Sequence, residues 1–99
     1  MNKNDEQRIY GSMLEMIHKI IVDFAESYHG AMDSSDRMNA FNRAKWEILI
    51  LKDFAEELFR ADLLSMGMAD SICRRLEDAL TKIASHVEVW DDYLDPNDK

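Results

Sequence analysis

Apolar residues recur at alternating steps of three and four along three long stretches of the chain. The stripes consist of Tyr10, Leu14, Ile17, Ile21, Phe24 and Tyr28; of Phe41, Ala44, Ile48, Leu51, Ala55 and Leu58; and of Ala69, Cys73, Leu76, Leu80, Ile83, Val87, Trp90 and Leu94. This spacing places the apolar side chains on one face of an α-helix. The pattern therefore predicts helices over about residues 5–29, 35–63 and 66–94.

The two short stretches between these helices carry turn and cap signals. Gly30 follows the first stripe, where a glycine commonly takes the left-handed conformation that ends a helix. The cluster 33–36, Asp-Ser-Ser-Asp, supplies an N-cap for the second helix, and Ser65, close to Gly67, supplies one for the third. Because both connections are short, neighbouring helices are expected to run antiparallel. The predicted fold class is all-α, an up-down-up antiparallel three-helix bundle that self-association completes.

Helices 5–29 and 35–63 carry more apolar residues than one buried face needs. On the second helix, Trp46 lies roughly 170° and Ile50 roughly 130° from the centre of the inner stripe, and Phe54 lies about 90° from it. On the first helix, a second apolar stripe lies about 90° from the first. It consists of Ile9, Met13, Met16 and Ile20.

Two interpretations of this surplus are open. Scattered exposed apolar side chains are normal on protein surfaces and need no partner. Alternatively, the surplus forms one contiguous patch that another subunit covers, and self-association, most often as a two-fold dimer, is the simplest form. We favour the second interpretation, and the methionines in and beside the helices suit an adaptable contact surface. The predicted interface consists of Ile9, Met13, Met16, Ile20, Trp46, Ile50 and Phe54.

The residue pattern supports no catalytic, cofactor or metal site. Glu15 and His18 have the spacing of the Glu-x-x-His element of di-metal helical bundles. Such a site also needs a second copy and two further inward carboxylates, and His86 has no Glu three residues before it. His18, His29 and His86 are scattered along the sequence, with no cysteine partner for zinc. Cys73 lies on an inner stripe and is expected to be a buried small hydrophobic residue rather than a nucleophile. We therefore predict that the protein is not an enzyme.

The chain carries 20 acidic against 12 basic residues, a net charge of -8. That balance opposes non-specific binding to nucleic acid or to an anionic membrane, because both need a positive field. No apolar run approaches the ~18–20 residues of a membrane span. The first residues are too polar for a signal or transit peptide, and a single cysteine fits a reducing compartment. We expect a cytoplasmic protein.

Acidic residues gather near the end of the chain, at Glu88, Asp91, Asp92, Asp95 and Asp98. Residues 95–99 are interpreted as a solvated acidic tail. The alternative is that the acidic end of the chain is a nucleic-acid mimic or a patch for a basic partner. All 99 residues are assigned to one helical domain, since a chain of this length rarely divides.

Residues 44–90 resemble part of a known family. The run Ala44-x-Trp46-Glu47-Ile48-x-x-Leu51-Lys52, the segment Leu63-Leu64-Ser65 and a leucine-spaced helix that ends at Trp90 are similar to the C-terminal helical hairpin of the small "four helix bundle" proteins. That family includes the accessory variability determinants of diversity-generating retroelements and proteins encoded in ribosomal-RNA intervening sequences. The resemblance implies a non-enzymatic protein that forms homo-oligomers, and no binding residue is carried over. The retroelement proteins bind nucleic acid through basic surfaces, a role that the acidic charge of this chain opposes.

These observations predict a non-enzymatic helical interaction module, an adaptor or accessory protein that acts as a homo-oligomer and binds another protein. The alternative is a small acidic inhibitor that occupies the nucleic-acid-binding site of an enzyme, as anti-restriction and anti-CRISPR proteins do. Such a mimic needs carboxylates in rows at about the phosphate spacing. Acids alternate with bases along residues 35–63 and 66–94, so the inhibitor ranks second.

Overall fold

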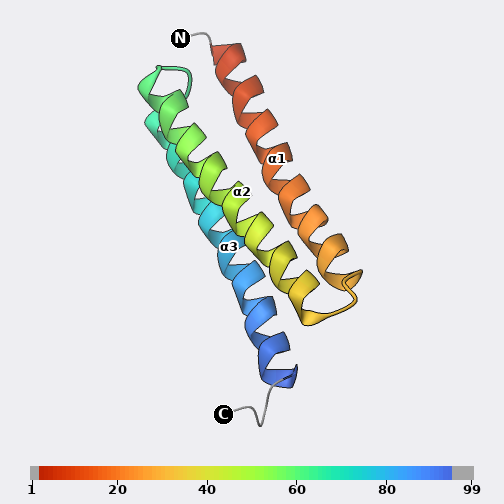
Figure 1. Cartoon of the computed structure of the whole chain (residues 1–99). Coiled ribbons are helices and arrows are strands. Elements are labelled where there is room, and N and C mark those ends of the chain that lie inside the picture. The colour runs from red at the N-terminus through yellow and green to blue at the C-terminus, as the bar shows by residue number, and fades with distance from the viewer. Residues whose placement is uncertain (1–2, 95–99) are drawn as a thin grey trace.

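The protein forms three long α-helices that are joined by two short connections (Figure 1). This computed structural model describes residues 3–94, with the side chains of residues 3–87. The helices are α1 (Lys3–His29), α2 (Ser34–Arg60) and α3 (Met66–Leu94). Each helix contacts both others and successive helices run antiparallel, so the predicted all-α three-helix bundle is confirmed. Within residues 3–94, no helix has the length and the apolar character that a membrane span requires.

The N-caps of α2 and α3 are those that the sequence predicts. Asp33 Oδ1 accepts a hydrogen bond from the backbone N–H of Asp36 at 2.8 Å. Ser65 Oγ accepts one from the backbone N–H of Met68 at 3.2 Å. Each cap satisfies a donor in the first turn that has no partner within its own helix.

The end of α2 at Arg60 comes a few residues earlier than predicted, because the chain closes a hydrogen-bonded motif there. The backbone N–H of Leu63 donates to Leu58 O at 2.9 Å, and that of Asp62 donates to Phe59 O at 3.0 Å. This is the Schellman arrangement, in which the residue after the C-cap takes a left-handed conformation. Asp62 takes that conformation, with a φ of 63°.

Gly30 does not take the left-handed conformation that we predicted, since no glycine within the described residues has a positive φ. Its backbone N–H donates to Glu26 O at 3.0 Å, which continues the hydrogen-bond pattern of α1 by one residue. The next N–H, that of Ala31, donates to Tyr28 O at 3.3 Å and tightens the last turn. The prediction was wrong because these bonds satisfy the carbonyls at the end of α1 without a left-handed residue.

The core is one cluster of buried apolar side chains from all three helices. The contribution of α2 consists of Ala40, Ala44, Ile48, Leu51, Ala55 and Leu58. This is the predicted stripe, except that Ala40 is buried and Phe41 packs at the edge. Because the side chains of the three alanines are small, both neighbouring helices can approach this face of α2 closely.

The apolar arc of α1 is wider than predicted. Met13 is 1% exposed and Ile20 is 9% exposed, so both lie in the core. Leu14 packs at the edge of the core and Ile21 is exposed. A helix with two neighbours buries an arc of more than about 100°, because each flank of the arc meets one neighbour. The assignment of Met13 and Ile20 to an outward-facing second stripe is therefore wrong.

The buried face of α3 is widened in the same way. Ile72 and Ala79 are buried although the predicted stripe omits them, whereas Cys73 and Leu80 pack at its margin. The residues that prediction and structure share are Ala69, Leu76, Ile83 and Val87. A single stripe of residues at alternating steps of three and four covers only the centre of the buried face of α3, because that face meets both α1 and α2.

Predictions for the end of the chain lie outside the described side chains. They concern Trp90 and Leu94 of the third stripe, the acidic residues from Glu88 onward and the tail 95–99. They stay predictions.

Two hydrogen bonds join α1 to residues about 60 positions later in the chain. Glu6 is buried, and its Oε2 accepts from the backbone N–H of Ser65 at 2.6 Å. Tyr10 OH and Ser71 Oγ lie 2.8 Å apart. The first bond ties the start of α1 to the connection between α2 and α3, and the second ties α1 to α3 directly. Both lie at the end of the bundle where α1 begins (Figure 1).

Replacing Asp62 by glycine is expected to stabilise the protein. Glycine takes a φ of 63° without the steric cost that an L side chain carries there. The expected gain in the free energy of unfolding is about 0.5–1 kcal/mol, which chemical denaturation followed by circular dichroism measures. Asp62→Ala is the control: it keeps a Cβ but loses the tolerance of aspartate for this conformation, so it should be less stable than the wild type. Equal stability of all three proteins would contradict the prediction.

Candidate interaction surface

A groove runs between α1 and α2, and none of the described side chains of α3 lines it. It consists of two hollows of about 440 Å³ and 240 Å³ that share Met16. The larger hollow is lined by Asp5, Arg8, Ile9, Ser12, Met13, Met16, Phe54, Leu58 and Leu63. The smaller hollow is lined by Met16, Lys19, Ile20, Asp23, Glu47, Ile50 and Leu51. We call the two hollows together the α1–α2 groove.

Six of the seven residues predicted for an interface line this groove. Met13 and Ile20 form its floor, because they belong to the core. Ile9 is half-buried and packs against the core from α1. The groove is therefore floored by core side chains, not by a separate outward stripe.

The remaining predicted residues are exposed, and three of them share one line along α2. Met16 is 46%, Ile50 50% and Phe54 47% exposed. Trp46 is 65% exposed and lines neither hollow. Trp46, Ile50 and Phe54 follow at steps of four, so they form one row along the helix. We call this row the α2 ridge; it adjoins the groove, because two of its residues also line the hollows.

Sequence periodicity missed Leu63, which is exposed and lines the larger hollow. The residue belongs to the connection after α2, where no helical period assigns a face. Leu49, one residue before Ile50, is exposed as well and widens the apolar surface of α2.

Charged side chains of both signs surround the groove. Asp5 and Arg8 form an exposed ion pair at the larger hollow. Lys19, Asp23 and Glu47 line the smaller one. Three acids against two bases leave this face much closer to neutral than the chain, whose net charge is -8. An exposed pair contributes little to stability, but mixed signs limit the repulsion between two such faces.

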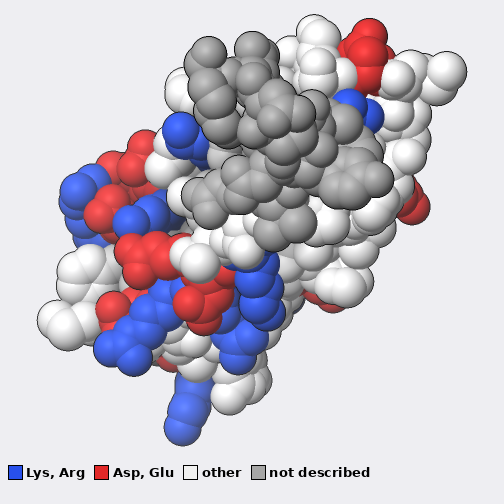
Figure 2. All heavy atoms as spheres, turned by 90° about the horizontal axis from the view of Figure 1, so that it is seen from below, with Lys and Arg blue, Asp and Glu red and all other residues white. Residues whose placement is uncertain are grey.

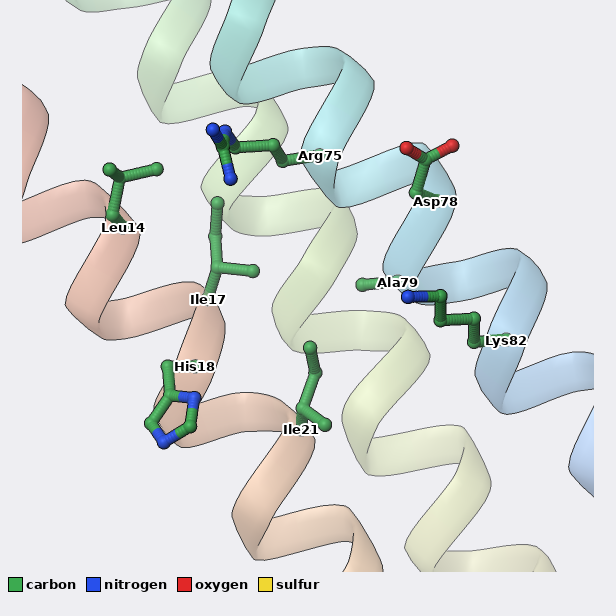
Figure 3. A pocket seen from close by; sticks show the side chains of 8 residues that line it. All are labelled: Leu14, Ile17, His18, Ile21, Arg75, Asp78, Ala79 and Lys82. Atoms are coloured by element: carbon green, nitrogen blue, oxygen red, sulfur yellow. The ribbon is translucent and has the colours of Figure 1, made fainter.

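A further hollow of about 270 Å³ lies between α1 and α3, with α2 behind it (Figure 3). Its lining consists of Leu14, Ile17, His18, Ile21, Arg75, Asp78, Ala79 and Lys82. Figure 3 shows Arg75 and Lys82 extending from α3 into the space between the two helices, opposite Ile17 and Ile21. This hollow is more polar than the α1–α2 groove, and no residue predicted for an interface lines it.

The contact of Tyr10 on α1 with Ser71 on α3 is electrostatically favourable. The hydrogen bond with Ser71 lowers the pKa of Tyr10, burial opposes that effect, and Arg75 lowers the pKa further. Arg75 thus lies close enough to the Tyr10 hydroxyl to act on it. The arrangement holds two helices together and provides no second group for proton transfer beyond a serine.

Cys73 is half-buried on α3, beside the ion pair that Lys52 of α2 forms with Glu77 of α3 at 2.9 Å. Burial raises the pKa of the Cys73 thiol; Lys52 opposes the shift, and neighbouring carboxylates add to it. The thiol is therefore protonated at neutral pH, and a protonated thiol is a poor nucleophile. The cysteine lies at the margin of the core, so it is less buried than we expected.

Two of the three histidines, although far apart in the sequence, lie close together in the structure. The rings of His29 and His86 have centroids 5.6 Å apart, whereas His18 lies three turns earlier on α1. No group of three or more His, Cys, Asp and Glu side chains in the described part of the chain is arranged to hold a metal ion. The contact between His29 and His86 depends on how α1 and α3 align in space, which their sequence positions do not reveal.

Comparison of the chain with protein-family models, with curated proteins and with solved structures finds no match. The groove, the ridge and the charges around them are therefore the basis for a functional proposal.

Cys73 is expected to react slowly with iodoacetamide in the folded protein at neutral pH. The raised pKa leaves little thiolate and the side chain is partly shielded, so the rate should be roughly tenfold or more below that of the unfolded chain. Intact-mass spectrometry over time measures the rate. Raising the pH should accelerate the reaction, because more thiolate forms. Native labelling as fast as labelling in denaturant would show that the thiol is neither shielded nor shifted.

Proposed function

We propose that this protein is a non-enzymatic helical interaction module that acts as a homo-oligomer through the α1–α2 groove and the α2 ridge. The observation that carries the proposal is the gathering of large, half-exposed apolar side chains on one face, beside a groove with a floor of core residues. Single exposed apolar residues need no explanation, but contiguous apolar surface of this kind is typical of an interface.

A second copy of the chain fits this surface, because the ridge and the groove adjoin on the same face. In a two-fold arrangement, the ridge of each subunit enters the groove of the other. Trp46 is the anchor, since it is the most exposed ridge residue and large aromatic side chains dominate interface energetics. Fully burying a large apolar side chain contributes about 1.5–3 kcal/mol, and two-fold symmetry counts each residue twice.

The charge pattern also favours self-association at this face over others. Two chains that each carry a net charge of -8 repel one another. Around the groove, however, Arg8 and Lys19 alternate with acids, so two-fold packing sets bases of one subunit opposite acids of the other. The charged residues around the groove then reduce the repulsion between the two subunits, while the apolar floor of the groove contributes the affinity.

The resemblance of residues 44–90 to the four helix bundle proteins supports a non-enzymatic homo-oligomer as well. We further propose that the oligomer serves as an adaptor or accessory protein for another protein, in the cytoplasm, where a lone free cysteine such as Cys73 is usual. The acidic charge argues against nucleic acid as a partner.

The acidic inhibitor of a nucleic-acid-binding enzyme ranks second, because acids are interleaved with bases. Asp70 pairs with Arg74 at 3.0 Å, and Glu77 pairs with Lys52 at 2.9 Å. Figure 2 shows acidic and basic side chains next to one another on the end of the bundle that it presents. A mimic of a phosphate backbone is better served by unpaired rows of carboxylates.

Ile50→Glu is the variant that tests the interface. The residue is half exposed in the single chain, so each chain should stay helical. In the oligomer, the change places a carboxylate without a partner in an apolar contact, at a cost of at least about 3 kcal/mol. That corresponds to roughly 100-fold weaker association. Light scattering after size exclusion measures the mass, and circular dichroism measures the helix content.

Leu51→Glu is the matched control, one residue further along α2. Leu51 is buried, so a charge there should unfold the chain itself rather than separate folded subunits. An oligomeric wild type, a smaller but helical Ile50→Glu and an unfolded Leu51→Glu are the expected set. A wild type that is monomeric at tens of micromolar, or an oligomer that Ile50→Glu leaves intact, rules out self-association through this face.

A further inference from the structure

His29 and His86 lie beside one another although α1 and α3 are not consecutive in the chain. Their ring centroids are 5.6 Å apart and their planes meet at 76°. His29 is the last residue of α1, and His86 lies on α3. Both residues are exposed, so an ion in solution can reach their ring nitrogens.

The position of His86 is fixed by core residues. Its ring lies 5.1 Å from that of Tyr28 at 68°, and 6.3 Å from that of Phe24 at 84°. Phe24 and Tyr28 are buried in the core, so His86 packs against two aromatic rings that the core holds in place. The packing of the bundle thus brings His86 next to the end of α1, while the exposed rings of His86 and His29 are free to turn.

We infer that His29 and His86 together bind a divalent late transition-metal ion, with Zn²⁺ as the reference case. A ligating imidazole nitrogen lies about 2.0–2.1 Å from zinc, which puts the ring centroid roughly 3.2 Å from the ion. Two rings on one ion then have centroids about 4.5–6.4 Å apart, for N–Zn–N angles from about 90° to 180°. The observed 5.6 Å lies within this range, and the exposed rings need only turn to aim their nitrogens at one point.

Water completes the coordination of this site. No third His, Cys, Asp or Glu within the described residues joins the pair. The site is therefore weaker than a structural zinc site with four protein ligands, and it is open to exchange. Imidazole suits zinc, nickel and copper, whereas magnesium and calcium prefer oxygen ligands, so the pair selects late transition metals. His29 and His86 are far apart in the sequence, and the structure brings their rings together.

A bound ion joins the end of α1 to α3, further along the bundle than the hollow between these helices. At the other end of the bundle, Tyr10 and Ser71 already tie the same two helices together. A ligand that binds the folded chain and not the unfolded one stabilises the fold by mass action. The metal therefore acts as a second tie between α1 and α3, and it does so independently of the α1–α2 groove.

Titration of untagged full-length protein with zinc chloride, by calorimetry, tests the site. His86→Phe and His29→Phe keep an aromatic ring in the packing but remove the ligand. Each should weaken zinc binding roughly tenfold or more, while His18→Ala, the third histidine, should bind like the wild type. Zinc should also raise the thermal midpoint of the wild type and of His18→Ala, but not that of the two phenylalanine variants. Magnesium should do neither.

Absence of zinc binding to the wild type at millimolar zinc overturns the inference. So does a His86→Phe protein that stays folded by circular dichroism and binds zinc as tightly as the wild type, because the ion then lies elsewhere. The oligomeric state of the variants is a separate measurement, so failure of this site leaves the α1–α2 groove proposal untouched, and the reverse also holds.

Discussion

The packing of α2 against both α1 and α3 through one narrow face is the constraint on which the rest of the structure depends. That face combines Ile48 and Leu51 with buried alanines such as Ala44 and Ala55. Because the alanines add no bulk, α1 and α3 both come close to α2 and contact each other less. A hollow therefore remains between α1 and α3. On the opposite flank of α2, Trp46 is exposed, and none of the described side chains buries it.

Apolar stripes alone do not fix how far one helix slides along another. A slide of one turn, about 5.4 Å, nearly restores the same apolar pattern. It would, however, break the 2.6 Å hydrogen bond between Glu6 and Ser65, and a buried carboxylate that loses its donor is costly. The polar contacts at the start of α1 thus select one alignment of the bundle. The same alignment brings His29 beside His86 at the other end, so the two ends are not independent features.

The sequence predicts most of the fold because periodicity and caps are local. The stripe of α2, the caps at Asp33 and Ser65 and the antiparallel order follow from neighbouring residues. The buried face of α1 was predicted too narrow. The spacing of apolar residues gives the direction of each side chain, but it does not give the number of helices that pack around α1. Met13 and Ile20 therefore turned out to be the floor of the groove rather than its exposed rim. Contacts such as that of Glu6 with Ser65 depend on the alignment in space, which no local pattern encodes.

The proportions of the molecule bear on the proposed role in binding. Its Cα atoms span 56 × 23 × 14 Å, and a body so narrow has a large surface for the volume that it encloses. The hollow between α1 and α3 and the groove between α1 and α2 are each lined chiefly by two helices, so neither is an enclosed chamber in which reactants are shielded from water. Core residues line both of them, but the groove is less polar than the hollow, and its floor of Met13 and Ile20 is continuous with the core. A helix laid on that floor therefore extends an existing core, and its binding contributes to the stability of the chain beneath it as well as to association.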